Sequence, residues 1–429
     1  MATPATPDLP FERHTLANGL RVVLHRDSAL PLVTVNLWYH VGSKDERPGR
    51  TGFAHLFEHM LFQGSENVGT NDHFRYIQQV GGVANGSTWY DRTNYYETLP
   101  AHQLDLGLWL ESDRMGYLLP AITEENLETQ RFVVMNERRQ RVDNQPYGGA
   151  SERLHELLYP AEHPYHWPVI GYMEDIEAAT LEDVRAFCRS YYTPNNAVLT
   201  LAGDFEPEEA LARVEHYFGD IPSGPPVPPL APIVAGLQPL ADGGREAILD
   251  DVRLPRVYFG FRAPAYGRRL WYAADLLAGI LSGGKSSVLY RDLVYERQIV
   301  QDIGAYVDPT EAVATFAVIA TARPGVPIET VEAAVAEHLA RAAGAPPHPD
   351  DLERACNKVL TEYYSGLQKL DNRADLFSQF TTLFDDPGGL AREADRYREV
   401  TGEDVAAYAA AFLAPERGVR VTVEPRSAG

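Results

Sequence analysis

The segment 51–62 carries the side chains whose types and spacing could do chemistry. It reads Thr-Gly-Phe-Ala-His-Leu-Phe-Glu-His-Met-Leu-Phe and contains His55, Glu58 and His59. On an α-helix, residues four apart lie on one face about a turn apart, so both imidazoles could bind one metal ion with Glu58 beside it. The rest of the segment is apolar, and a buried polar edge is costly unless its groups are satisfied. The pattern favours a zinc site with a carboxylate base over two core histidines hydrogen-bonded to Glu58.

Two protein ligands do not complete a hydrolytic zinc site, which usually takes three and leaves one position to water. The next strongly helical segment is 123–142, which opens with Thr123 as a candidate cap and two acids in its first turn. One face combines positions three and four apart: Gln130, Val133, Val134 and Glu137. We expect three arginines to face solvent: Arg138, Arg139 and Arg141. Glu137 is therefore the acid on the apolar side, although a lone helical glutamate is more often a solvated surface residue.

Together these residues resemble the inverted zinc proteases, or inverzincins, the family of pitrilysin, insulin-degrading enzyme and the mitochondrial processing peptidases. The family pattern is His-x-x-Glu-His with a third ligand, a glutamate, on a second helix downstream. Residues 136–148 are also similar to the segment that follows this glutamate in bacterial members. The resemblance implies that His55, His59 and Glu137 bind one Zn²⁺ ion per chain and that Glu58 is the general base. It implies hydrolysis of peptides or unfolded polypeptides.

Two further positions are candidate substrate-binding residues by the same resemblance. Some members carry a second glutamate seven residues before the ligand, where this chain has Gln130. The segment 81–97 is similar to the edge strand beside the zinc, where a peptide substrate adds as a further strand, and Asn85 lies in it. Because Asn-Gly is also a common turn sequence, a plain turn at Asn85 is the alternative.

An internal repeat organises the chain. Residues 180–194 and 401–415 match at a constant offset, and each is followed by a β-rich segment. A period this long indicates duplicated domains. We predict an α+β fold of two homologous α/β sandwich domains, each an antiparallel-rich sheet packed with helices; the resemblance adds a peptide cavity between them. The expected boundaries are a flexible tail (1–10), a metal-binding catalytic domain (11–220), a proline-rich linker (221–240) and a homologous domain (241–429).

The second half lacks the chemical groups of the first. Aligning the repeats places Ala274, Leu277 and Ala278 at the positions of the metal motif, and Glu362 opposite Glu137. Active family members usually bring an Arg and a Tyr, seven residues apart, from this half to the zinc site. The corresponding positions here are Val294 and Gln301, and the nearby candidates do not reproduce the spacing: Arg291, Arg297 and Tyr306.

The missing pair bears on assembly. In split members of the family, one chain carries the metal motif and a homologous partner carries the Arg/Tyr pair. The resemblance therefore implies that this chain is the metal-bearing subunit of a heterodimer and is nearly inactive alone. The alternative is a non-catalytic structural or processing subunit of the same fold.

A competing motif lies at 279–286, where Gly-Ile-Leu-Ser-Gly-Gly-Lys-Ser satisfies the P-loop pattern of nucleotide-binding proteins. A P-loop needs a buried strand before it and a helix after it. The preceding residues are rich in Ala and Leu with helical spacing. We expect a glycine turn between helices and keep a P-loop NTPase as the remote alternative.

Composition excludes several classes of protein. The 429 residues include 38 basic and 60 acidic side chains, a net charge of −22, which argues against a nucleic-acid partner. No apolar run approaches the ~18 residues that span a membrane. Residues 1–10 lack the basic and apolar regions of a signal peptide, and two cysteines in helical patterns do not indicate disulfides. We expect a cytoplasmic protein, or a periplasmic one whose signal peptide has been removed.

Overall fold

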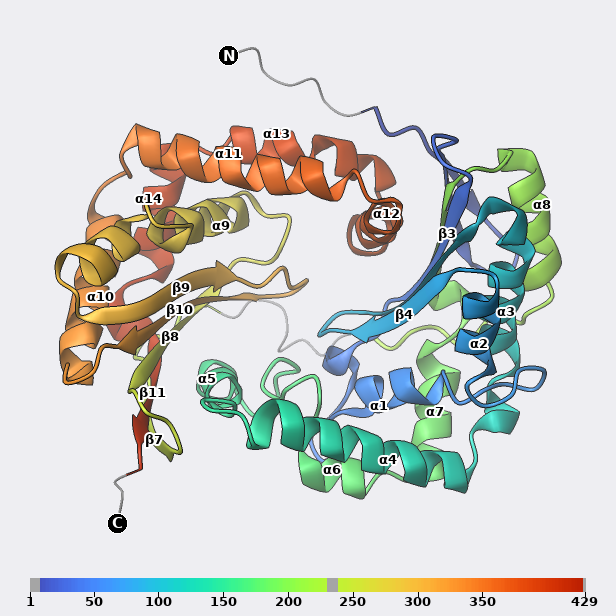
Figure 1. The fold of residues 1–429 in the computed structure, drawn as a ribbon, viewed down its shortest axis with the longest axis horizontal. Coiled ribbons are helices and arrows are strands. Elements are labelled where there is room, and N and C mark those ends of the chain that lie inside the picture. Colours follow the sequence, from blue (N-terminus) through green and yellow to red (C-terminus); the bar gives the residue numbers. More distant parts are fainter. Residues whose placement is uncertain (1–7, 230–237, 427–429) are drawn as a thin grey trace. The chain divides into compact units, whose positions relative to one another are not determined.

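The chain folds into two compact units in a computed structural model that describes residues 8–229 and 238–426. Unit 1 comprises the described parts of Met1–Glu137, Pro168–Leu230 and Tyr364–Glu393. Unit 2 comprises those of Arg138–Trp167, Ala231–Tyr363 and Ala394–Gly429. Each unit is a sheet covered by helices (Figure 1).

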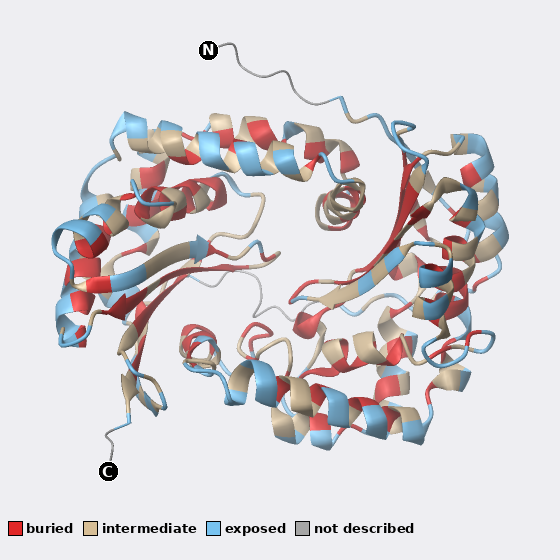
Figure 2. Cartoon of the chain, viewed as in Figure 1, coloured by how far each residue is buried: buried red, intermediate tan, exposed pale blue. Residues whose placement is uncertain are grey.

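The sheet of unit 1 has six strands in the order β1-β2-β6-β3-β5-β4. Their bounds are β1 Glu12–Thr15, β2 Arg21–Arg26, β3 Leu32–Tyr39, β4 Val83–Thr88, β5 Thr93–Pro100 and β6 Ala197–Gly203. Only β2 and β6 pair in parallel. The central strand β3 is buried on both faces, as Figure 2 shows, whereas β4 is the edge strand.

Helices cover both faces of this sheet. Those of unit 1 are α1 Phe53–Met60, α2 Asp72–Gln79, α3 Leu104–Tyr117, α4 Glu124–Arg138, α6 Met173–Glu177, α7 Leu181–Tyr191, α8 Pro207–Phe218 and α12 Leu370–Phe384. Alternate residues of β3 point to opposite faces, so Val35 and Leu37 enter the hydrophobic core with α1 and α3. Trp38, on the other face, donates a 2.7 Å hydrogen bond to Asp375 of α12. The helix α4 ends at the unit boundary and continues as a π-helical turn, η4 Arg139–Asp143.

Unit 2 repeats this topology. Its strands are β7 Arg245–Asp250, β8 Arg256–Ala263, β9 Val300–Val307, β10 Ala314–Ala322 and β11 Val419–Pro425, in the order β7-β11-β8-β10-β9. Strand by strand this matches β2-β6-β3-β5-β4, with one parallel pair at the same place. The helices are α5 Ala150–Leu158, α9 Arg269–Ser282, α10 Ile328–Gly344, α11 Pro349–Gly366, α13 Glu393–Arg398 and α14 Gly402–Phe412. The predicted α+β fold with two homologous domains is confirmed.

The matched sequence segments occupy equivalent places in the two units. Each forms a helix that precedes the parallel-paired strand: α7 before β6, and α14 before β11. Thr180 caps the first helix reciprocally with Asp183, and Thr401 caps the second with Asp404. The shared Thr-x-Glu-Asp signature is therefore a helix start in both copies.

Each compact unit is built from segments that are not contiguous in the chain. Residues 138–167, which include α5, belong to unit 2, and residues 364–393, which include α12, belong to unit 1. Each half thus contributes one helix to the sheet of the other unit. The predicted boundaries remain predictions about the duplication; most of the tail and part of the linker lie outside the described residues. Among the described helices, none is long and apolar enough to cross a membrane.

Candidate metal centre

A half-buried acid, Glu46, positions the start of helix α1. Glu46 accepts hydrogen bonds of 2.8 Å from the backbone N–H groups of Gly52 and Ala54, which the helix leaves unpaired at its N-terminus. Burial raises the pKa of Glu46 well above its ordinary value, and the two N–H donors oppose that shift. Gly52 has φ of 81°, and a Cβ there would approach the Ile170 carbonyl oxygen to 2.6 Å. The chain can enter α1 at this angle only with glycine.

The proposed ligands on α1, His55 and His59, lie close to the third, Glu137 of α4. His59 Nε2 lies 3.3 Å from Glu137 Oε2, and His55 Nε2 lies 3.8 Å from the same oxygen. The two imidazole rings are 4.9 Å apart between centroids and nearly perpendicular. One ligand atom from each of the three residues lies within 4.8 Å of the others. Two imidazoles and one carboxylate are donors that zinc accepts, so the set fits that ion.

On the helix α4, the observed exposure of each residue agrees with the predicted face for some positions and not for others. Val134 and Gln130 are buried, as the periodicity predicts, but Val133 is 39% exposed. The prediction that Arg138 faces solvent was wrong: it is buried and donates to both carboxylate oxygens of Glu152 on α5 at 2.8 Å. A guanidinium can enter the interior because a bidentate carboxylate pairs it. Arg139 and Arg141 are exposed, as predicted.

Glu58 lies on the helix α1, between the two histidines, and its carboxylate is bound by strand β4. Thr88 Oγ1 donates a 2.6 Å hydrogen bond to Glu58 Oε2. Burial raises the pKa of Glu58, while the Thr88 hydrogen bond and the charges of His59 and Arg92 oppose the rise. Thr88 was not among the residues predicted from the sequence, although alternation along β4 places it on the same face as Gly86, where a Cβ atom would contact Phe62 directly after α1.

The candidate substrate-binding residues have different surroundings. Asn85 is exposed in β4 and pairs with Tyr96 of β5, so the turn alternative for Asn85 was wrong. The turn falls instead after Thr88, where Trp89 N–H donates to the Arg92 carbonyl at 2.8 Å. Gln130 is 6% exposed. A role in binding substrate remains a prediction for both residues.

A second cluster of metal-ligand types lies in the core of unit 1. One ligand atom each from His73, Glu97 and Glu111 lies within 4.8 Å of the others. Arg114 ion-pairs with Glu111 and stacks its guanidinium 4.2 Å from the Tyr95 ring. This buried cation supplies the positive charge that the carboxyl groups need, and a metal ion beside it would be repelled. We therefore interpret the cluster as part of the core.

The positions of unit 2 that align with the metal motif and with the Arg/Tyr pair have the following surroundings. Three apolar residues of α9 stand at the motif positions and are buried: Ala274, Leu277 and Ala278. Glu362 is exposed on α11. Val294 is buried and Gln301 is exposed, while Arg297 is engaged with Asp292 and Glu337. The segment 279–286 begins with the last residues of the helix α9, which ends at Ser282, and its glycine turn comes directly after them. A P-loop requires a strand before the loop, and this described segment has a helix there.

Models of one protein family match both halves of the chain. Residues 21–165, which contain the motif on α1, match the model described as insulinase, peptidase family M16. Residues 178–359 match the model described as the peptidase M16 inactive domain. The zinc protease PqqE of Helicobacter pylori is 28% identical over 417 residues, covering 96% of this chain and 93% of the relative. An uncharacterized zinc protease of Mycobacterium leprae is 28% identical over 416 residues, covering 95% and 91%.

Solved structures share the fold over nearly the whole chain. The crystal structure of a protease from Helicobacter pylori superimposes with a TM-score of 0.90 at 27% identity, covering 97% of this chain and 100% of that one. A peptidase M16 inactive domain from Pseudomonas fluorescens superimposes with a TM-score of 0.86 at 18% identity, covering 98% and 99%; at that identity the likeness is one of fold.

Proposed function

The chain belongs to peptidase family M16, and from this membership we propose that it is a zinc-dependent metallopeptidase acting on peptides or unfolded polypeptides. His55, His59 and Glu137 are its metal ligands and Glu58 is its general base. The observation that carries the proposal is the convergence of His55 and His59 on Glu137 Oε2, at 3.8 and 3.3 Å. These groups come from two helices, and holding three partly buried polar side chains together is costly unless something binds them.

The chain's own groups account for the proton transfers. A zinc ion in such a site supplies a water of lowered pKa and polarises the carbonyl of the scissile amide. Glu58 Oε2 accepts the hydrogen bond of Thr88, and with that oxygen held, Oε1 would accept the proton of the attacking water. Glu58 then returns this proton to the leaving nitrogen.

The edge strand β4 supports a peptide as the substrate. It is the last strand of its sheet, and Asn85 lies on it in an exposed position. Backbone pairing at a sheet edge binds an extended peptide with little demand on its sequence. Thr88 of the same strand touches Glu58, so a peptide paired along β4 passes close to the base.

We also propose that the chain is the metal-bearing subunit of a heterodimer. Val294 and Gln301 stand where active family members carry an Arg and a Tyr. A homologous partner would supply this pair, which binds substrate and stabilises the oxyanion.

Zinc analysis combined with a peptide assay tests the site. Zinc per chain, measured by inductively coupled plasma mass spectrometry, should be near one and should be lost in His59→Ala. Glu58→Gln should keep its zinc and, assayed together with a homologous partner that restores activity, lose hydrolysis of a quenched fluorescent peptide by about 10²-fold or more, because it removes only the base. The control is His216→Ala, which removes an exposed helical histidine of α8.

Two results would contradict the assignment. Loss of zinc in Glu58→Gln as complete as in His59→Ala would show that Glu58 is a ligand. Bound zinc without hydrolysis, even with a homologous partner present, would favour the non-catalytic subunit.

A further inference from the structure

The hydroxyl group of Thr88 ties the edge strand to the metal helix. Thr88 is the last residue of β4, and its Oγ1 donates to Glu58 Oε2 of α1 at 2.6 Å. A hydrogen bond this short to a carboxylate belongs to the stronger, charge-assisted class. Strand and helix are therefore joined through the side chain that we propose as the base.

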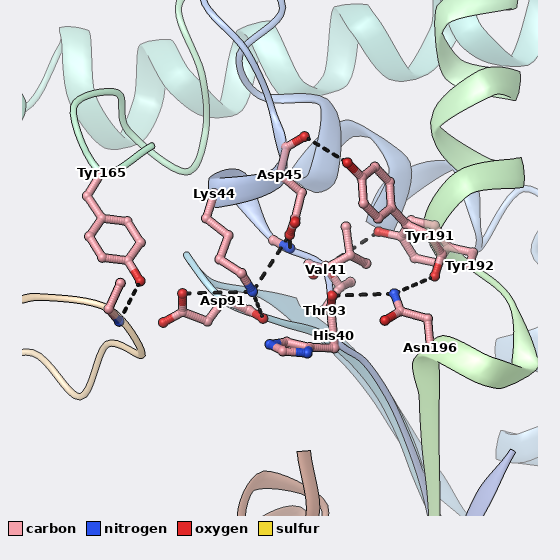
Figure 3. Close-up of polar contacts among 12 residues, drawn as sticks. His40, Val41, Lys44, Asp45, Asp91, Thr93, Tyr165, Tyr191, Tyr192 and Asn196 are labelled. Atoms are coloured by element: carbon pink, nitrogen blue, oxygen red, sulfur yellow. Dashed lines mark hydrogen bonds and ion pairs between the residues drawn. The ribbon is translucent and has the colours of Figure 1, made fainter. Parts of the chain in front are cut away.

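Neighbouring groups fix the direction of this hydrogen bond. Thr88 Oγ1 also lies 3.5 Å from Thr93 Oγ1 on the paired strand β5. Thr93 donates its own proton to the Val41 carbonyl at 2.9 Å and accepts from the Tyr192 hydroxyl at 3.4 Å, a group of residues that Figure 3 labels. A threonine hydroxyl has one proton, and an ionised carboxylate can only accept. The Thr88 proton is therefore directed at Glu58.

The end of β4 is itself anchored. Arg92 donates to the carbonyl oxygen of Ser87 at 2.7 Å and to its hydroxyl at 2.6 Å. Thr88 pairs with Thr93 across the hairpin. Because the residues on both sides of Thr88 are held, its hydroxyl is a fixed point against which the Glu58 carboxylate is oriented.

We propose that Thr88 is a positioning residue for hydrolysis: it binds Glu58 Oε2 and so presents Oε1 to the attacking water. This inference rests on the proposed function, because it takes Glu58 as the base. It assigns β4 a second role, since the strand that pairs with the peptide also orients the group that activates water. Residues that orient reacting groups from behind typically contribute 10- to 100-fold to activity.

Isosteric replacement of the hydroxyl tests the proposal. The full chain is assayed on a quenched fluorescent peptide, together with its partner where hydrolysis requires one. Thr88→Val should lower kcat by about 10- to 100-fold with KM within about twofold, because substrate pairing is kept while the base is left unoriented. Zinc content and melting temperature should stay at wild-type values. Thr88→Ser, which keeps the hydroxyl, should recover most of kcat.

The matched control is Thr98→Val. Thr98 is another strand threonine of unit 1, and its hydroxyl bonds only to that of Thr34 among the described contacts, at 2.8 Å. This variant should keep wild-type kcat. If Thr88→Val does not fold, Thr88→Ala is the second variant, because it removes the hydroxyl without placing a methyl group beside Glu58.

Several outcomes would overturn the inference. One is an unchanged kcat in Thr88→Val, and another is a Thr88→Ser variant as impaired as Thr88→Val. A third is loss of zinc in Thr88→Val, which would show a structural role. Hydrolysis that is lost in Glu58→Gln and kept in Thr88→Val would overturn this inference alone. Failure of the wild type to hydrolyse any peptide would overturn the proposed function as well.

Discussion

Single residues in the core of unit 1 show how carboxyl groups are kept there. Burial, followed by the neighbouring charge of Glu111, raises the pKa of Glu97 well above its ordinary value. Burial lowers the pKa of His73 well below its ordinary value. Both shifts favour the neutral forms, and Glu111 is the carboxylate that forms the ion pair with Arg114. Of the two glutamates, Glu111 is the one whose carboxylate pairs with the buried guanidinium of Arg114.

Glu97→Gln should therefore become more favourable relative to the wild type as pH rises. In the wild type the folded state retains a proton on Glu97 that the unfolded chain releases near pH 4.3. Stability is thus lost as pH rises from about 4.3 towards the raised pKa, and glutamine removes this loss. Urea unfolding at pH 5 and pH 7 measures the free energy of unfolding of the variant and of the wild type. An equal difference between the two proteins at both pH values would refute the prediction.

Glu111→Gln is the matched comparison. It leaves the buried Arg114 guanidinium without its anion, and breaking a buried pair in this way costs about 3 to 5 kcal/mol. The loss should appear in the same unfolding experiment at both pH values. A Glu111→Gln variant as stable as Glu97→Gln would contradict the assignment of the charge.

At the scale of elements, the positions of the proposed zinc ligands depend on where α1 begins. The helix is short, Phe53–Met60, and two of its residues are the proposed ligands. Its first N–H groups are bound by Glu46 rather than by a side chain at the cap position. The orientation of His55 and His59 is therefore set from outside the helix.

Glu46→Ala should loosen this arrangement. Two buried N–H groups lose their acceptor, which costs about 1 to 3 kcal/mol of stability. Zinc affinity, measured by competition with a chromophoric chelator, should fall about 10- to 100-fold as the ligands lose their fixed position. Glu206→Ala, which removes an exposed partner of Arg26, is the control and should keep both stability and affinity. Unchanged zinc affinity in Glu46→Ala would show that α1 is held by packing alone.

At the scale of the whole molecule, the two units share a topology, and the proposed metal ligands all lie in unit 1. Both sheets have the same strand order and the same single parallel pair. Of the two equivalent helices, α1 carries two of the proposed metal ligands, while α9 is buried and apolar at the aligned positions. The second copy kept the residues that build the fold and not those that do chemistry.

The purified chain alone should hydrolyse peptides very slowly. Val294 and Gln301 cannot provide the charge and hydroxyl of the Arg/Tyr pair, and loss of an oxyanion donor alone costs about 10²- to 10³-fold in kcat. Adding a homologous subunit that has the pair should restore hydrolysis, and the restored activity should disappear with Glu58→Gln. Rapid hydrolysis by a monomer or homodimer would refute the heterodimer.

Local periodicity and spacing were enough to predict several features of this protein. The helical period placed His55, Glu58 and His59 on one edge of an apolar helix, and α1 has that form. The repeated Thr-x-Glu-Asp segments predicted duplicated domains because a capping box is encoded within four residues. Such features depend on neighbours in the chain, and these are visible in the sequence.

Other features were decided only by tertiary contacts between distant segments. Arg138 is buried because Glu152 pairs it, and Glu46 caps a helix to which it does not belong. Thr88 meets Glu58 because β4 packs against α1, and α12 covers the sheet of the opposite half. The partner of each group lies many residues away or in another element, so no local pattern identifies it. The sequence alone determined which side chains could bind a metal, whereas tertiary packing decided which groups hold them in position.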